Sequence, residues 1–203
     1  ELRAGILTIA EKWELLLQRH SSAGATTGKA IPIPGNWIPS EEMVDAICRG
    51  ETPQPDKILE HPWQFFQWND ALLRSDFALI THKRYSLPIP ETVEVINSGQ
   101  VFIEEGARLG HCILNASEGP IYLDRDSEIM EGSSIRGPFS LGKGSVVKMG
   151  ARIYGGTSIG PYCVVGGEIK NSLIMGYSNK AHDGYLGDSV IGEWCNLGAG
   201  TTV

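Results

Sequence analysis

The sequence predicts a mainly β fold, a left-handed parallel β-helix of six-residue (hexapeptide) repeats, preceded by a smaller, partial α/β domain. Aliphatic residues return at every sixth position through eight consecutive repeats: Leu123, Ile129, Ile135, Leu141, Val147, Ile153, Ile159 and Val165. Neither an α-helix nor a single strand has this period, whereas a triangular solenoid points one aliphatic side chain inward from each short face. Nineteen of the 25 glycines lie from Gly106 onward, while four of the five tryptophans precede residue 70. This change in composition predicts two domains, residues 1–90 and residues 91–203.

Small side chains recur four positions after most of these aliphatics: Ser127, Ser133, Ser145, Ala151, Thr157 and Cys163. Only small residues fit the corner of a narrow triangular prism. Glycine often follows the aliphatic, where a Cβ would obstruct the turn of the chain. Phe139 and Ile169 fall on small-residue positions, so we expect bulged or widened corners there.

Residues 1–90 alternate helical patterns with proline-rich connections. Thr8 and Glu11 have the spacing of a capping box and predict the start of an amphipathic helix. Ser40 predicts the cap of a short helix that ends near Gly50. The apolar residues from Trp63 to Leu73 predict a helix that packs on the solenoid, and residues 20–36 predict a loop.

The six-residue frame slips by two residues after Val165. In the new frame the predicted inward positions are Leu173, Asn179, Tyr185, Ile191, Leu197 and Val203. Irregular backbone can leave the wall of a solenoid at an interruption, and functional groups usually lie on such departures. We therefore expect the chemistry of this protein beside the slip.

Composition excludes several classes of protein. A formal net charge of −7 argues against nucleic acid as the main partner, because phosphate backbones require clustered Lys and Arg. No apolar run is long enough to span a bilayer, so we expect no membrane partner. The four cysteines are scattered without paired metal spacing, which is typical of a reduced, cytoplasmic protein. The chain begins without methionine and stops within a repeat, so we expect a longer natural protein.

Polar residues crowd the segment from Lys170 to Ala199, and His182 is the one histidine of five that lies in it. An imidazole titrates near neutrality and can take a proton from an amine or hydroxyl that attacks an acyl group. A lone surface histidine more often has no catalytic role, so the residue type alone leaves both interpretations open. A zinc site of the carbonic anhydrase type needs three histidines, and the solenoid has only His111 and His182, so we expect no metal.

The segment AHDGYLGDSVIGEWCNLGAGT resembles the hexapeptide-repeat acyltransferases, and most of all the acetyltransferase half of the GlmU-type bifunctional enzymes that make UDP-N-acetylglucosamine. The motif is a histidine at His182, Y-L-G-D from Tyr185, and N-x-G-A-G-T from Asn196, with a lysine at Lys170, twelve residues before the histidine.

This resemblance implies an acetyl transfer from acetyl-CoA to an amino-sugar phosphate of the glucosamine-1-phosphate type. His182 would be the general base and Lys170 would bind the sugar phosphate. Tyr185 and Asn196 would contact the amino sugar, and Ala199 would offer backbone to acetyl-CoA. An arginine for the phosphate is implied one coil before the lysine, where Arg152 is the nearest arginine and Tyr154 can also be aligned.

Nearly the whole chain also resembles sugar nucleotidyltransferases that carry a GlmU-like repeat domain. The residues that carry this resemblance are ELRAGILTIAEKWE, PWQFFQWNDALLRSDF and EIMEGSSIRGPFSLGKGSVVKMGARIYGGTSIGPY. It implies that residues 1–90 are part of a nucleotidyltransferase-like domain, with Mg²⁺ needed only if that activity is present. It also implies a homotrimer, because one flat face per coil can pack around a threefold axis.

Three hypotheses therefore remain open at the level of sequence. The first is acetyl transfer to an amino-sugar phosphate. The second is nucleotidyl transfer with a solenoid that only trimerises, and the third is a non-catalytic scaffold.

Overall fold

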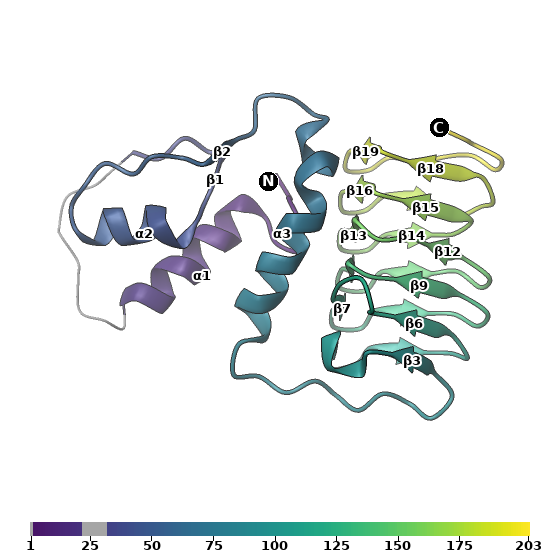
Figure 1. Ribbon diagram of the computed structural model, residues 1–203. Coiled ribbons are helices and arrows are strands. Elements are labelled where there is room, and N and C mark those ends of the chain that lie inside the picture. The colour runs from purple at the N-terminus through teal and green to yellow at the C-terminus, as the bar shows by residue number, and fades with distance from the viewer. Residues whose placement is uncertain (1, 22–31) are drawn as a thin grey trace.

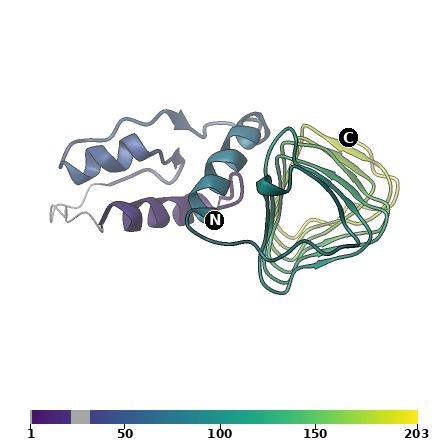
Figure 2. The ribbon, with the colours of Figure 1, turned by 60° about the horizontal axis from the view of Figure 1, so that its bottom comes forward.

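The computed structural model describes residues 2–21 and 32–203, with three α-helices in these ranges followed by a parallel β-solenoid (Figure 1). Most of the loop expected at residues 20–36 lies outside the described residues. Seen along its axis, the solenoid has a triangular outline, and the helices lie against one side of the triangle (Figure 2). The fold is thus the predicted left-handed β-helix with a smaller helical part before it.

The first two helices begin at the predicted caps. Helix α1 (Ile9–Ser21) starts at a capping box, in which the Glu11 N–H donates to Thr8 Oγ1 over 3.2 Å and the Thr8 N–H donates to Glu11 Oε2 over 2.7 Å. Helix α2 (Glu41–Cys48) is capped by Ser40. The short strands β1 (Trp37–Ile38) and β2 (Lys57–Ile58) pair antiparallel beside these helices.

The solenoid consists of strands β3 to β19, which form three parallel sheets. We call them faces I, II and III in chain order. Face I contains β3 (Glu94–Ile96), β6 (Ile113–Asn115), β9 (Ser134–Arg136), β12 (Arg152–Ile153), β15 (Glu168–Lys170) and β18 (Tyr185–Gly187). Face II contains β4 (Val101–Ile103), β7 (Ile121–Leu123), β10 (Phe139–Leu141), β13 (Thr157–Ile159), β16 (Leu173–Ile174) and β19 (Val190–Ile191). Face III contains β5 (Arg108–Leu109), β8 (Glu128–Ile129), β11 (Val146–Val147), β14 (Val164–Val165) and β17 (Asn179–Lys180). A short 3₁₀-helix, Ser98–Gln100, joins β3 to β4.

The interior of the solenoid confirms the period from Leu123 to Val165. All eight predicted aliphatics lie in one core cluster and are at most 2% exposed. The small residues of the predicted corners are buried as well. Each coil therefore buries one aliphatic from each face, which supplies most of the apolar burial that holds the coils together.

Beyond Val165 the predicted frame is partly wrong. The inward positions are Ile174, Lys180 and Leu186, which align with Ile159, Val165 and Ile169, whereas Leu173, Asn179 and Tyr185 were expected there. The predicted frame assumed that the period slips once and that all corners have the same length. Instead, the spacing between successive inward residues falls from six positions to four at Ile169 and to five at Ile174 and Ile191. Ile191 and Leu197 pack against the core, as predicted.

Helix α3 (Gln64–Thr81) covers face II, which confirms the expected packing of this helix on the solenoid (Figures 1 and 2). Asn69 is fully buried, donates to the Gly156 carbonyl over 2.6 Å and accepts from Ser158 Oγ over 2.9 Å. Leu173 points outward and packs in a cluster with Leu72 of the helix. Its burial therefore comes from the helix, and not from the interior of the solenoid. Faces I and III are not covered by the helices.

Candidate functional site

The edge between faces III and I, which we call the III–I edge, contains one corner that is shorter than its neighbours. Four residues join β11 to β12 and four join β17 to β18, but only Gly166 and Gly167 join β14 to β15. The corner expected to be widened at Ile169 is thus shortened, because Ile169 takes the central inward position of its strand over Ile153. A Cβ at Gly167 would lie 2.9 Å from the His182 carbonyl oxygen, so glycine lets the next corner rest directly on this one.

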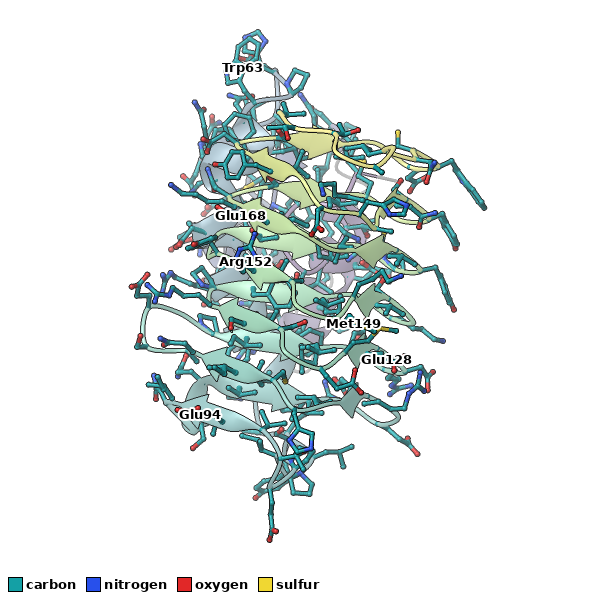
Figure 3. All side chains as sticks on the ribbon, turned by 90° about the vertical axis from the view of Figure 1, so that its right-hand side faces the viewer. Trp63, Glu94, Glu128, Met149, Arg152 and Glu168 are labelled. Carbon is teal, nitrogen blue, oxygen red and sulfur yellow. The ribbon has the colours of Figure 1, made fainter. Side chains whose placement is uncertain are left out.

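The shortened corner leaves the tip formed by His182 and Asp183 projecting from the edge. Two coils below, Met149 and Gly150 form the tip of the corresponding corner. The coil between these two tips has the shortened corner, which has no equivalent residues. Two coil spacings amount to about 9–10 Å. Met149 is 66% exposed at the corner between β11 and β12, whereas Glu128 lies on β8 of face III (Figure 3). The His182 side chain is exposed at this tip.

Lys180 holds this corner from inside the solenoid. Its side chain occupies the inward position above Val165 and is only 1% exposed. The Nζ group donates to the His182 carbonyl over 2.5 Å and to the Gly166 carbonyl over 3.2 Å. Burial lowers the pKa of the Lys180 ammonium group, and the carboxylate of Asp183 acts in the opposite direction. Sequence reasoning missed this residue, because it assigned the inward position to Asn179.

Two of the predicted site residues, Lys170 and Tyr185, lie together on face I. Lys170 is aligned beneath Gly187, and the Tyr185 hydroxyl lies over the Gly187 Cα, so the phenol ring extends along the strand above Lys170. Lys170 is exposed and makes no ion pair with any residue in ranges 2–21 and 32–203. It lines a cleft of about 460 Å³ that also includes Tyr154 and Arg74 of helix α3.

The register between β12 and β15 shows which residue lies one coil below Lys170. Ile153 aligns with Ile169, so Tyr154 is beneath Lys170 while Arg152 is beneath Glu168. Arg152 Nε lies 3.3 Å from Glu168 Oε2 in an exposed ion pair on face I (Figure 3). Arg152 is therefore on the same face as Lys170 but in the column of residues nearer to the III–I edge.

The other two predicted residues lie at and beyond that edge. Asn196 bridges to Asn179 on face III. Ala199 lies in the corner directly above His182, where the Gly200 N–H donates to the Asp183 carbonyl over 3.0 Å. The structure thus places His182 and Ala199 on the edge, Asn196 to one side of it, and Tyr185, Arg152 and Lys170 to the other.

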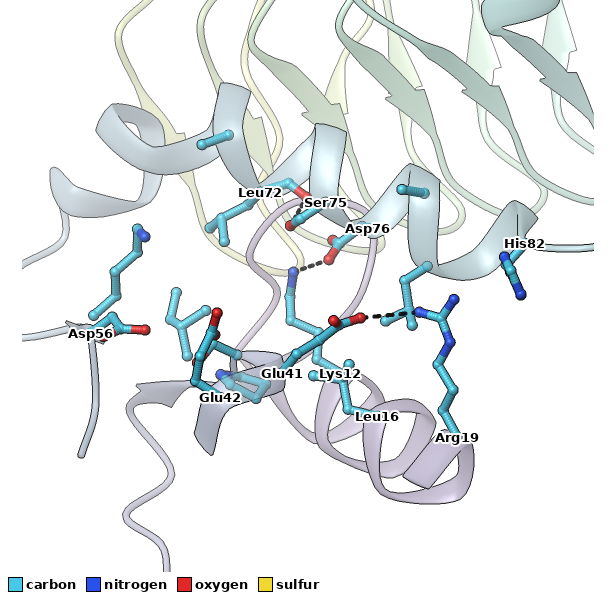
Figure 4. Close-up of a pocket in the computed structure, with 17 residues that line it drawn as sticks. Lys12, Leu16, Arg19, Glu41, Glu42, Asp56, Leu72, Ser75, Asp76 and His82 are labelled. Carbon is cyan, nitrogen blue, oxygen red and sulfur yellow. Dashed lines mark hydrogen bonds and ion pairs between the residues drawn. The ribbon is translucent and has the colours of Figure 1, made fainter. Parts of the chain in front are cut away.

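A larger cavity, of about 590 Å³, lies between α1, α2 and α3 (Figure 4). Two ion pairs line it: Lys12 contacts Asp76, and Arg19 contacts Glu41 over 3.2 Å. Asp76 also accepts hydrogen bonds from the backbone N–H groups of Ile6 and Leu7. These contacts tie the N-terminal loop to helix α3, so the Lys12–Asp76 pair has a structural role.

No group of three His, Cys, Asp or Glu side chains in the described ranges is placed to hold a metal ion. None of the helices described is long and apolar enough to cross a bilayer.

Comparison with curated proteins gives two matches over the C-terminal region. A stretch of 47 residues is 49% identical to the bifunctional protein GlmU of Gloeobacter violaceus, and 45 residues are 53% identical to that of Rippkaea orientalis. The solenoid is GlmU-like. The matched stretches cover 22% and 21% of this chain and only 10% of each relative. No protein-family model matches the chain.

The predicted site residues of the GlmU-like solenoid therefore lie at the III–I edge and on the two faces beside it. The exposed imidazole, the unpaired lysine and the tyrosine come from two successive coils. The structure leaves this edge accessible because helix α3 lies on face II.

Proposed function

We propose that the III–I edge transfers an acetyl group from acetyl-CoA to the amino group of an amino-sugar phosphate, of the glucosamine-1-phosphate type that leads to UDP-N-acetylglucosamine. The observation that carries this proposal is the position of His182, exposed on a projecting corner, next to a face with an unpaired lysine. The similarity to GlmU supports the reaction class. In this proposal residues 1–90 and 91–203 are separate domains of a cytoplasmic homotrimer.

The imidazole of His182 acts as the general base. It takes a proton from the attacking amine as the nitrogen bonds to the thioester carbonyl carbon, and the C–S bond breaks to release CoA, which leaves as the thiol after protonation. The reaction yields an N-acetyl amide and free CoA, and it needs no metal or redox partner. A backbone N–H near Ala199 is suited to the thioester oxygen, where negative charge develops.

Face I binds the acceptor. Lys170 has no carboxylate partner among the described residues and is suited to the sugar phosphate. Tyr185 extends over its strand and offers a ring face and a hydroxyl to the sugar. Arg152 adds a second cation if the ion pair with Glu168 opens, and Asn196 orients the amine from face III.

The test measures thiol release from acetyl-CoA with glucosamine 1-phosphate as acceptor. His182→Ala should lower kcat by about 10²-fold or more, the usual contribution of a general base. His111→Ala is the matched control, because His111 is exposed on the same edge between β5 and β6 and should leave the rate unchanged. Lys170→Ala should mainly raise the KM for the sugar phosphate. Equal rates for the wild type and His182→Ala, with a folded variant, would refute the proposal.

A further inference from the structure

A cleft of about 460 Å³ lies where face I turns toward face II, at the end of face I that is farthest from His182. The outward residues at this end of face I form a column that runs through Arg136, Tyr154 and Lys170 in successive coils. Two coil spacings, about 9–10 Å, separate Arg136 from Lys170, and Tyr154 lies between them. All three residues line the cleft, and Arg74 lines it from helix α3. The cleft therefore has cations at two levels and on two walls.

Arg74 is held in place by three hydrogen bonds. Its Nε donates to Asp70 Oδ1 over 2.6 Å, and its Nη2 donates to Asp70 Oδ2 over 3.3 Å and to the Glu118 carbonyl over 2.6 Å. The other amino group, Nη1, has no hydrogen-bond partner in residues 2–21 and 32–203 and is available to an acceptor atom in the cleft. The orientation of this guanidinium group is thus fixed before a ligand binds, which lowers the entropy cost of binding.

The carboxylates that line the cleft leave its cations available to a ligand. Asp70 pairs with Arg74, Glu118 Oε1 accepts from Arg136 Nη1 over 3.3 Å, and Asp188 accepts from Asn171 Nδ2 over 2.5 Å. The Arg136–Glu118 pair is about half exposed, and an exposed ion pair contributes little to stability. An anionic ligand can therefore take Arg136 from Glu118 at low cost. Lys170 has no carboxylate partner among the described residues.

The column continues below Arg136 with Asn115 and Ile96. Asn115 Oδ1 accepts from the backbone N–H and the hydroxyl of Ser117, over 3.0 and 2.6 Å, and its Nδ2 has no partner in the part of the chain that the structure describes. Ile96 is 45% exposed. An amide donor beside an apolar side chain suits a nucleobase, which has carbonyl acceptors on its edge and a flat apolar face.

We propose that Lys170, Arg136 and Arg74 bind a diphosphate, and that the acceptor class of this site is an amino sugar joined to a nucleoside through that diphosphate. The inference rests on the proposed function for the reaction at His182 and goes beyond it in the second phosphate and the nucleoside. A single phosphate at Lys170 leaves the two guanidinium groups, lower in the cleft, without a ligand. The Lys170 and Arg136 side chains are long enough to converge over Tyr154 on the two phosphates, and a guanidinium group matches phosphate oxygens with its planar fork of donors.

The test measures affinity by isothermal titration calorimetry without acetyl-CoA, with UDP-glucosamine and glucosamine 1-phosphate as the two probes. The wild type should bind UDP-glucosamine about tenfold more tightly. Arg136→Ala and Arg74→Ala should each remove most of this difference and leave the affinity for glucosamine 1-phosphate unchanged, whereas Lys170→Ala should weaken the binding of both probes. Glu118→Gln should tighten the binding of UDP-glucosamine, because Arg136 is then free of its carboxylate partner. Arg125→Ala is the matched control, since Arg125 is an exposed arginine at the corner between β7 and β8.

Equal affinity of the wild type for the two probes would overturn the diphosphate site, as would an Arg136→Ala variant that binds UDP-glucosamine as tightly as the wild type. The Arg136 side chain is about half exposed, so circular dichroism should show an intact solenoid for this variant. If UDP-glucosamine binds through Arg136 but neither acceptor leads to thiol release, the proposed acetyl transfer is refuted and the diphosphate site remains. If thiol is released with glucosamine 1-phosphate and UDP-glucosamine binds no more tightly, the diphosphate site is refuted and the acetyl transfer remains.

Discussion

Substitution of Lys180 by methionine tests how the His182 corner is held. Methionine keeps most of the aliphatic stem of lysine inside the solenoid but removes the donor to two carbonyl groups. The His182 carbonyl lies at an exposed corner and can be hydrated, whereas Gly166 is buried and its carbonyl would lose the donor. A buried acceptor without a partner costs about 1–3 kcal/mol. The substitution also removes the desolvation penalty of the buried ammonium group. On balance we expect Lys180→Met to lower the free energy of unfolding by about 1–3 kcal/mol at pH 7.

The assay is urea unfolding of the wild type and Lys180→Met, followed by circular dichroism. Lys148→Met is the control, because Lys148 lies at the same edge but points outward, and its loss should change the free energy of unfolding by less than about 0.5 kcal/mol. A variant as stable as the wild type, or more stable, would refute the reasoning, since the desolvation penalty would then exceed the value of the hydrogen bonds.

The pH dependence of this difference has a defined sign. Burial lowers the pKa of Lys180 in the folded protein, so the unfolded chain binds more protons in the range between the folded pKa and 10.5. Stability that depends on Lys180 should therefore increase as the pH rises toward 10.5 and decrease as the pH falls through the folded pKa. The advantage of the wild type over Lys180→Met should grow from pH 7 to pH 10. A difference that is constant over this range would contradict the placement of Lys180 in the interior.

Three further predictions concern burial elsewhere in the chain. Asn69→Ala should destabilise the fold by about 2–4 kcal/mol in urea unfolding, because two buried partners on face II lose their hydrogen bonds. Asp76→Asn should cost about 3–5 kcal/mol, because the charge of Lys12 would remain buried without its partner. Burial raises the pKa of the Cys112 and Cys163 thiols to about 11, so both should resist alkylation at pH 8 in the native protein while the two half-buried cysteines react.

Each of these predictions has an outcome that would contradict it. An Asn69→Ala variant within about 0.5 kcal/mol of the wild type would mean that water replaces the side chain under the helix. An Asp76→Asn variant of unchanged stability would show that Lys12 is neutral in the fold. More than two thiols modified at the same rate, counted by mass spectrometry, would mean that the solenoid opens locally.

The sequence predicted the solenoid well from Leu123 to Val165 because the interior of a narrow prism accepts one inward aliphatic per face and little else. The same periodicity wrongly placed Leu173 in the interior. Leu173 is apolar because helix α3 covers it from outside the solenoid. One sequence cannot distinguish burial by the interior from burial by a neighbouring element. It also could not predict an inward lysine, because Lys180 is stabilised by carbonyl groups at a corner whose length the period does not determine.

The sequence named candidate residues for the site but contained no information on their arrangement in space. The motif gave Lys170, His182 and Tyr185, and the structure adds that His182 lies at an edge while Lys170 lies at the far end of the strand on face I. Which residue lies beneath Lys170 depends on corner lengths, so the choice between Arg152 and Tyr154 required the register. Neither the motif nor the period contains that information.

The three faces of the solenoid differ in what can contact them, and this difference constrains where chemistry can occur. Face II is occupied by helix α3, so faces I and III are the faces that the helices leave open to other molecules. The unpaired Lys170 suits face I to an anionic ligand, whereas the outward strand residues of face III above the Arg108–Glu128 ion pair are uncharged. The III–I edge is where these two surfaces meet, and the His182 corner there rests directly on the shortened corner at Gly166 and Gly167. The exposed His182 at this edge therefore lies beside the face that carries Lys170, which is the arrangement that the proposed transfer to an anionic acceptor requires.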